Sequence, residues 1–417
     1  MMTLCHKKQS STTRFLCLLL LLLSISSSFF TLAIQNNQNN NTLINIFTEE
    51  EVKQCYGKIS KDPQFVSGNG WVHIVTACRE GTEGINDDNQ NMHIQQQERR
   101  RRLDPINKNV CIMKSSKDGG YTWVNFQVIS FNGWKGTYFN GCKGIYDRYR
   151  DNLLVQYAHS PPGGDELNKT IYQIISKDDG KTWTNPRNID KYLSSCKTAD
   201  KKMKGRLGAN NAGNRIQLDN GRLIWGTSGT LHGAICLWYS DDGGETYNAT
   251  GVFAEHTNEW SMVIADNTTG LLLINSRATP GTDKEKFRKN QWSKDNGVTW
   301  SKAEESTLED SVNKHGHGCE ASLTNIDNKL FFLNPTGQGD DARTKMVVRC
   351  SLDHGKTWPK SYHVTSTTSG GYSDLIRVNV NNDKILMIGW GYHPDGNVHD
   401  PNSHTNIQIE HIAIDWC

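Results

Sequence analysis

The sequence predicts an all-β fold, a six-bladed β-propeller, and three observations lead to this prediction. An eight-residue phrase recurs five times, and its copies start 53 to 64 residues apart. Short runs rich in β-branched and aromatic residues separate the copies. Almost no stretch after the N-terminal segment shows helical periodicity. A hairpin unit repeated at such a period is typical of a propeller.

The repeated phrase has the chemistry of a tight hairpin turn. Each copy begins with Ser, turns through Asp-x-Gly and continues with Thr and an aromatic residue. The Asp side chain can accept N–H groups of its own turn, and Gly supplies a positive φ. The aromatic residue can pack between neighbouring units. The five copies occupy residues 116–123, 176–183, 240–247, 293–300 and 351–358.

The runs between the phrases are expected to be strands. Five phrases, with strand-rich sequence before the first and after the last, fit six blades of about four strands each. One irregular segment, residues 80–103, is polar and is expected to be a long surface insertion. The clearest runs are residues 71–76, 153–157, 222–225, 271–274 and 385–388.

Charge gives no reason to expect a nucleic-acid partner. The net charge of the 417-residue chain is +2, and a nucleic-acid binder usually carries a large basic excess. The one basic run, Arg99 to Arg102, is short and isolated, so a solvated loop or a proteolytic site is the favoured interpretation.

The N-terminus predicts entry into the secretory pathway. Residues 1–34 are expected to be a signal peptide or signal anchor, because Lys7, Lys8 and Arg14 precede six consecutive leucines. Serines after the apolar run favour cleavage, and a membrane would be a partner only if the signal stays uncleaved. Residues 35–49, rich in Asn and Gln, are expected to be a linker, and residues 50–417 the propeller.

A secreted or lumenal location is therefore expected, and the protein is expected to be a glycoprotein. Four sequons fit passage through the secretory pathway. They begin at Asn40, Asn168, Asn248 and Asn267.

Nine cysteines follow the signal segment, and none forms a CxxC pair, so disulfides are expected rather than zinc. An odd number leaves at least one free thiol or an intermolecular bridge. One hypothesis is that ring closure between the first and last strands brings Cys55 and Cys417 together. His315 and His317 bracket a glycine but lack a third ligand, so no metal and no cofactor is predicted.

The repeated phrases resemble the Asp boxes of sialidases (neuraminidases), whose fold is a six-bladed propeller. Four further segments resemble motifs of this family and follow one another in family order, with Glu320 where the family has Gln. The resemblance covers the chain from about Glu50 onward. The segments are Asn258-Glu259 with Asn275-Ser276-Arg277, the stretch from His317 to Leu323, Asn334-Pro335 with Arg343, and the stretch from Gly371 to Leu375.

This resemblance implies an exo-α-sialidase that removes terminal sialic acid from sialylated glycans with retention. The family binds the substrate carboxylate with three arginines, since a guanidinium group binds a carboxylate through two parallel hydrogen bonds. Arg277 and Arg343 match the second and third of these arginines. Tyr372 would be the nucleophile, since a neutral phenol is not repelled by the substrate carboxylate. Glu259 would accept the phenol proton.

The first part of the chain departs from the family pattern. Lys58 stands where the first of the three arginines is expected, and lysine cannot form the two-pronged bond. Arg79 resembles the family arginine that contacts the sugar further along this strand. The general acid is expected to be Asp104, twelve residues before the first box, with Asp87 and Asp88 as alternatives closer to Arg79.

Three other functions compete with hydrolysis. A trans-sialidase would use another sugar in place of water as the acceptor. The lysine at position 58 favours a weakly active or inactive sialic-acid-binding propeller. A structural propeller without sugar specificity fits the boxes but not the Tyr372 and Glu259 motifs. The box aspartates are expected in turns on the rim away from the pocket, with no catalytic role.

Overall fold

The computed structural model divides the chain into two units, residues 1–43 and residues 44–417. Among the described residues, no helix is both long and apolar enough to cross a membrane. The structure describes residues 43–55, 59–60, 62–78, 110–130, 138–160, 170–199, 214–228, 234–253, 257–278, 286–313, 316, 318–364, 371–392 and 405–417.

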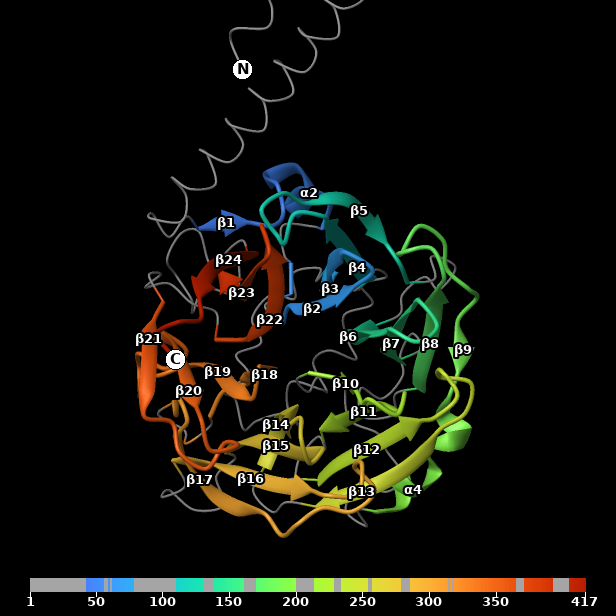
Figure 1. Ribbon diagram of the computed structural model, residues 1–417. Coiled ribbons are helices and arrows are strands. Elements are labelled where there is room, and N and C mark those ends of the chain that lie inside the picture. The colour runs from blue at the N-terminus through green and yellow to red at the C-terminus, as the bar shows by residue number, and fades with distance from the viewer. Residues whose placement is uncertain are drawn as a thin grey trace, which may run out of the picture. The chain divides into compact units, whose positions relative to one another are not determined.

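The second unit is built from six four-stranded antiparallel sheets arranged as blades around a ring (Figure 1). The predicted all-β, six-bladed propeller is therefore confirmed. Blade 1 contains β2 (Gln64–Gly68), β3 (Trp71–Cys78), β4 (Val110–Ser116) and β5 (Val124–Val128). Blade 2 contains β6 (Tyr138–Asp147), β7 (Asn152–Ser160), β8 (Thr170–Ser176) and β9 (Arg187–Asn188). Blade 3 contains β10 (Ile216–Gln217), β11 (Leu223–Ser228), β12 (Ala234–Ser240) and β13 (Asn248–Phe253).

The other three blades repeat this plan, and short helices accompany the sheets. Blade 4 contains β14 (Thr257–Asp266), β15 (Leu271–Ala278), β16 (Phe287–Ser293) and β17 (Glu304–Glu309). Blade 5 contains β18 (Ser322–Ile326), β19 (Lys329–Pro335), β20 (Met346–Ser351) and β21 (Lys360–His363). Blade 6 contains β22 (Ser373–Val380), β23 (Asp383–Tyr392), β24 (Asn406–Ala413) and β1 (Ile44–Asn45). The helices are α2 (Glu49–Gln54), η2 (Asp190–Tyr192) and α4 (Ser194–Ala199).

The N-terminal end of this unit closes the ring. Strand β1 pairs with β24, with Ile44 opposite Ile409, so the fourth strand of blade 6 comes from the start of the chain (Figure 1). A capping box at Thr48 and Glu51 then begins α2. Residues 44–49, which were expected to be linker, therefore belong to the propeller unit.

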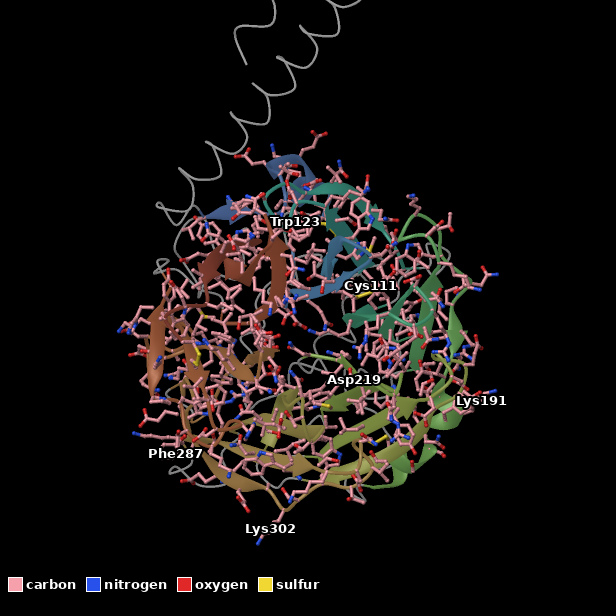
Figure 2. All side chains as sticks on the ribbon, viewed as in Figure 1. Cys111, Trp123, Lys191, Asp219, Phe287 and Lys302 are labelled. Carbon is pink, nitrogen blue, oxygen red and sulfur yellow. A yellow bond between two sulfur atoms is a disulfide. The ribbon has the colours of Figure 1, made fainter. Side chains whose placement is uncertain are left out.

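The apolar core lies between the blades rather than inside any one sheet. Between blades 6 and 1, for example, Met387 and Ile409 pack with Phe65 and Ile74. Figure 2 shows side chains filling the spaces between neighbouring sheets. The expected strand runs fall on the second strands of their blades, which are buried on both faces, so they appear in the sequence as continuous apolar runs. These strands are β3, β7, β11, β15 and β23.

Ring closure also explains why six blades carry five Asp boxes. Each box is the turn between the third and fourth strands of a blade, for example between β20 and β21. In blade 6 the third strand is β24, whereas the fourth strand is β1, which precedes blade 1 in the chain. No turn joins these two strands, so blade 6 has no position for a box.

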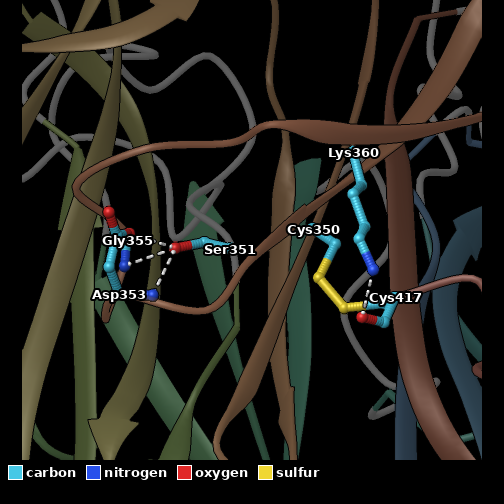
Figure 3. The surroundings of a disulfide bond; sticks show 6 residues. All are labelled: Cys350, Ser351, Asp353, Gly355, Lys360 and Cys417. Atoms are coloured by element: carbon cyan, nitrogen blue, oxygen red, sulfur yellow. Dashed lines mark hydrogen bonds between the residues drawn. A yellow bond between two sulfur atoms is a disulfide. The ribbon is translucent and has the colours of Figure 1, made fainter.

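The fifth box shows how the phrase builds its turn (Figure 3). Ser351 Oγ donates to Asp353 Oδ1 at 2.7 Å and accepts the Gly355 N–H at 2.9 Å. The N–H and hydroxyl of Thr357 donate to the same carboxylate at 2.9 and 2.6 Å. Although burial opposes the negative charge, these bonds lower the pKa of Asp353 below its ordinary value. The Asp353 carboxylate therefore stabilises the turn of its own box.

The box glycines also allow the blades to approach one another. Gly355 has φ 89°, and a Cβ at this position would collide with Leu273 of blade 4. The final aromatic residue of each box packs in the layer between its blade and the preceding one, as the sequence predicted. These residues are Trp123, Trp183, Tyr247, Trp300 and Trp358.

Four disulfides connect eight of the nine described cysteines, and the Cys55–Cys417 hypothesis is wrong. Cys55 ends α2 and lies against the end of β3, so it bonds to Cys78. Cys417 lies beyond β24 against blade 5 and bonds to Cys350 of β20, with Lys360 Nζ donating to the Cys417 carbonyl (Figure 3). The remaining pairs are Cys111–Cys142 and Cys196–Cys236. The expected unpaired thiol is the buried Cys319.

A buried histidine in blade 1 is expected to make stability depend on pH. His73 is fully buried, its Nδ1 lies 2.9 Å from Ser115 Oγ, and burial lowers its pKa from 6.5 to about 4, with Asp179 opposing. Its contribution is present above pH 6.5 and is lost as the pH falls through 4. Between pH 7.5 and 5 we expect the free energy of unfolding to decrease by about 2 kcal/mol through this residue.

Urea unfolding of wild type and His73→Gln at both pH values measures this contribution. The variant should lose about 2 kcal/mol less than wild type over this interval. An equal loss in the two proteins would contradict the assignment.

Candidate active site

Four of the predicted site residues come from three blades and meet at one end of the ring. Tyr372 immediately precedes β22, the inner strand of blade 6. Glu259 lies near the start of β14, the inner strand of blade 4, and Arg277 lies near the end of the adjacent antiparallel β15. Arg343 lies in the connection between β19 and β20 of blade 5. Starts of inner strands and ends of second strands lie at the same end of an antiparallel blade.

Tyr372, Glu259 and Arg277 form a closed triangle of hydrogen bonds. The Tyr372 hydroxyl donates to Glu259 Oε1. Arg277 Nη1 donates to Glu259 Oε2 at 2.5 Å and lies 3.5 Å from the Tyr372 hydroxyl. Glu259 and Arg277 are 5% and 7% exposed. A phenol therefore faces a carboxylate base that is itself held by a buried guanidinium group.

Burial and charge keep the resting phenol neutral. Burial, followed by the negative charge of Glu259, raises the pKa of Tyr372 well above its ordinary value, while Arg277 and Arg343 oppose the shift. Burial disfavours the charge of Arg277, but Glu259 and Tyr372 beside it raise its pKa well above the ordinary value. Arg277 therefore stays charged, and Tyr372 needs a base before it can act as a nucleophile.

Arg343 approaches the tyrosine from blade 5 through an unusual backbone conformation. Its guanidinium carbon lies 5.8 Å from the centroid of the Tyr372 ring. Its φ is 68°, and its N–H donates to Ser311 Oγ at 2.8 Å. Gly371 has φ 90°, and a Cβ there would stand 2.8 Å from Arg343 Cβ and 2.9 Å from Cys319 Sγ. Only glycine allows this close packing of Arg343 beside Tyr372.

A buried ion pair that was not predicted from the sequence bonds to Asn275, near Arg277, and to Cys319. Arg288 and Asp310 are fully buried and lie 2.9 Å apart. Arg288 also donates to Asn275 Oδ1 and, at 2.7 Å, to the Cys319 carbonyl, while Asp310 accepts the Cys319 N–H at 2.9 Å. The pair thus joins β15 and β16 to the segment before β18. The one signal in the sequence for this ion pair is the charge of Arg288 within residues 287–293, which form a strand.

A second group of charged residues lies beside the triangle, and the sequence motifs contained only two of its members, Glu320 and Asp374. Lys143 Nζ and Asp62 Oδ1 are 2.5 Å apart, and Asp374 accepts the Phe65 N–H at 2.6 Å. Burial raises the pKa of Asp374 to about 6. Burial also lowers the pKa of Arg215 to about 9, against the opposing charges of nearby carboxylates, including Asp374. The charge cluster consists of the buried residues Lys143, Arg215, Glu320 and Asp374 and the half-buried Asp62.

The central channel contains a cavity of about 230 Å³ further along the inner strands. Its lining comes from the inner strands of all six blades, for example Phe65 of β2 and Leu375 of β22, and includes Arg215. Its lining includes none of the four candidate site residues, Tyr372, Glu259, Arg277 and Arg343. This cavity is therefore separate from the candidate catalytic group.

The box aspartates lie at the other end of the blades, as predicted. First and third strands of a blade run parallel, so the turn after a third strand lies opposite the start of the first strand. Tyr372 precedes a first strand, whereas Asp353 follows a third strand. The boxes are therefore structural turns on the rim away from Tyr372.

Three predicted site residues lie outside the described part of the chain. They are Lys58, Arg79 and Asp104, and the same holds for the alternatives Asp87 and Asp88 and for His315 and His317. The insertion expected at residues 80–103 also lies outside the described ranges. Their roles stay predictions, whereas Tyr372, Glu259, Arg277 and Arg343 are brought together.

Sequence comparisons identify relatives of the chain. The family model of the BNR repeat-like domain matches residues 106–382, more than half of the chain. A sialidase from Bacteroides fragilis is 27% identical over 310 residues, covering 66% of this chain and 53% of its own length. A sialidase from Micromonospora viridifaciens is 26% identical over 300 residues, covering 66% and 44%. The chain spans about half the length of these curated relatives.

Solved structures share the fold at low identity. The NanB sialidase from Streptococcus pneumoniae superposes with a TM-score of 0.67 at 13% identity, covering 90% of this chain and 71% of its own. The intramolecular trans-sialidase from Ruminococcus gnavus, in complex with oseltamivir carboxylate, gives 0.62 at 15%, covering 86% and 95%. With five Asp boxes in a six-bladed ring that these solved sialidases share, the chain belongs to the BNR repeat-like domain family.

Proposed function

We propose that this protein is a retaining exo-α-sialidase that hydrolyses terminal α-linked sialic acids of glycoproteins, glycolipids or oligosaccharides. The observation that carries the proposal is the bond from the Tyr372 hydroxyl to Glu259, with Arg277 holding the same carboxylate. A phenol paired with a buried carboxylate is the arrangement that a tyrosine nucleophile needs. The similarity to two proteins named sialidases supports the same activity.

Arg277 and Arg343 would bind the carboxylate of the substrate. That carboxylate is attached to the anomeric carbon, so two fixed cations beside Tyr372 would place this carbon next to the phenol oxygen. A carboxylate nucleophile would be repelled by the substrate, whereas the neutral phenol is not.

Bond formation and proton transfer would then proceed in two steps. The Tyr372 oxygen forms a bond to the anomeric carbon while its proton passes to Glu259. The glycosidic bond breaks, and the leaving oxygen takes a proton from the general acid, for which Asp104 is the proposed residue. Water then attacks the anomeric carbon from the face that the leaving group has vacated and gives a proton to Asp104. The bond to Tyr372 breaks, the phenol oxygen takes its proton back from Glu259, and the product keeps the α-configuration.

We further propose that the protein acts in a secreted or lumenal compartment. Four disulfides connect eight of the nine cysteines that follow the N-terminal segment. Such a number is typical of proteins that fold in an oxidising compartment.

Turnover of a fluorogenic α-sialoside by the purified protein tests the activity. We expect release of the fluorophore, with the α-anomer of sialic acid as the first product by proton NMR. Binding of the sialoside without turnover would contradict the proposed hydrolytic activity and favour a sialic-acid-binding propeller. In that case Lys58→Arg, which restores the arginine that the family has, should create activity if position 58 is responsible. Formation of sialyl-lactose on adding lactose would indicate transfer rather than hydrolysis alone.

A further inference from the structure

The segment Cys319-Glu320 contacts the backbone on both sides of Tyr372. Before the tyrosine, Cys319 Sγ lies 2.9 Å from the position that a Cβ on Gly371 would occupy. After it, Glu320 Oε2 accepts the N–H of Ser373 at 3.0 Å. One dipeptide of blade 5 therefore fixes the three residues of blade 6 that carry the candidate nucleophile.

The dipeptide is itself held rigidly. The Cys319 N–H donates to Asp310 at 2.9 Å, and its carbonyl accepts from Arg288 at 2.7 Å. Arg288 and Asp310 form a fully buried ion pair. Both backbone groups of Cys319 are thus bonded to charged, immobile partners, which limits movement of the adjacent Glu320.

The Ser373 N–H has no strand that could replace Glu320 as its acceptor. The Tyr372 carbonyl accepts the Gly391 N–H at 3.0 Å, on the side of β22 that faces β23. Bonding sides alternate along an antiparallel strand, so the Ser373 N–H points to the inner edge of the blade. An inner edge has no neighbouring strand in the same sheet. A buried donor there needs a side-chain acceptor.

We propose that Glu320 is a positioning residue, which holds Tyr372 in line with Glu259 through the backbone of Ser373. The proposal rests on the sialidase activity proposed above and adds a residue that does not touch the reacting atoms. It assigns a function to the glutamate that stands where the family motif has glutamine.

The surroundings of Glu320 indicate that its hydrogen bond, rather than its charge, is the useful property. The side chain is 2% exposed, and Asp62 and Glu259 face it with like charge, whereas Lys143 and Arg215 oppose them. Burial, followed by the charge of Asp62, raises the pKa of Glu320 well above its ordinary value. A neutral carboxyl group still accepts an N–H, as a glutamine amide oxygen does.

Two substitutions separate this role from a general structural one. Glu320→Ala should reduce kcat on the fluorogenic α-sialoside by about 10- to 100-fold, because a nucleophile displaced by about 1 Å reacts far more slowly. The KM should change by less than about threefold, because the arginines remain, and so should the inhibition constant of DANA, an inhibitor bound in a solved Trypanosoma rangeli sialidase. Glu320→Gln should keep kcat within about threefold of wild type.

Asp190→Ala is the matched control. Asp190 accepts the N–H of Ile171 at 2.9 Å in blade 2, so this variant also removes a carboxylate from a strand N–H. Its kcat should equal that of wild type. If Glu320→Ala retains full kcat, or if Glu320→Gln loses as much as Glu320→Ala, the positioning role is wrong.

Hydrogen exchange of the peptide that contains Ser373 gives a readout that does not need activity. Exchange should accelerate in Glu320→Ala and stay near wild type in Glu320→Gln. If the wild-type protein has no turnover while this exchange pattern appears, the sialidase proposal fails but the backbone contact stands. If turnover is present and exchange is unchanged in Glu320→Ala, the positioning role is overturned and the sialidase activity is not.

Discussion

Replacing Tyr372 by phenylalanine is expected to lower kcat on an α-sialoside by about 10³-fold or more. The change removes the one oxygen that donates to Glu259 and would bond to the anomeric carbon. The ring still packs beside Arg343, so the fold and the affinity for DANA should be kept. Steady-state kinetics with the fluorogenic substrate, together with the melting temperature, measure both expectations.

Tyr362→Phe is the matched control for this variant. The Tyr362 hydroxyl donates to Glu410 Oε1 at 2.7 Å, so this tyrosine in the outer strand of blade 5 is also bonded to a glutamate. Loss of this phenol should leave kcat unchanged. If Tyr372→Phe keeps more than about a tenth of wild-type kcat, Tyr372 is not the nucleophile.

Replacing Arg277 by methionine is expected to have the largest effect on stability. Arg277 and Glu259 form a buried ion pair at 2.5 Å, and the variant leaves the Glu259 carboxylate buried without its cation. Removing one partner of a buried pair typically destabilises by about 3–5 kcal/mol. We expect a decrease of about 3 kcal/mol in the free energy of unfolding, measured in urea with the disulfides intact, and loss of turnover.

A double substitution tests whether the unpaired carboxylate is the cause. Glu259→Gln with Arg277→Met removes both charges, so the double variant should be more stable than Arg277→Met alone by at least about 1 kcal/mol. The pair of Arg148 with Asp219 is the surface control, because the two side chains are 45% and 86% exposed. Arg148→Met should cost at most about 1 kcal/mol. Equal losses from the two arginine variants would contradict the importance of burial.

Local chemistry in the sequence predicts most of the fold. A box such as residues 351–358 closes its turn with its own side chains, so its conformation does not depend on distant residues. The spacing of the boxes then gives the blade count. The position of the linker boundary could not be found in this way, because β1 has only two residues and is a strand only through its pairing with β24.

The disulfides show where reasoning from chain order fails. Ring closure does bring the first and last strands together, which suggested a bond between Cys55 and Cys417. However, α2 separates Cys55 from β1, and the residues after β24 carry Cys417 back to blade 5. The direction that a chain takes after its last strand depends on packing against another blade, which no local pattern in the sequence records.

The candidate site divides in the same manner. The residues that would react with substrate, Tyr372, Glu259, Arg277 and Arg343, lie in short motifs and were named from the sequence alone. Arg288 and Asp310, which support them, were not named, and Glu320 was named without a role, because each acts on a partner in another strand or blade.

The sequence by itself thus determined the turns, the strand runs, the six-bladed ring and the four residues that meet around the Tyr372 hydroxyl. Only the tertiary structure decided the cysteine pairing, the inclusion of β1 in the ring, and the contacts that hold Tyr372 against Glu259. The physical reason is the separation along the chain between the residues that interact. A turn or a strand is specified by residues a few positions apart, whereas Glu320 and Ser373 are 53 positions apart and meet only where two blades pack together.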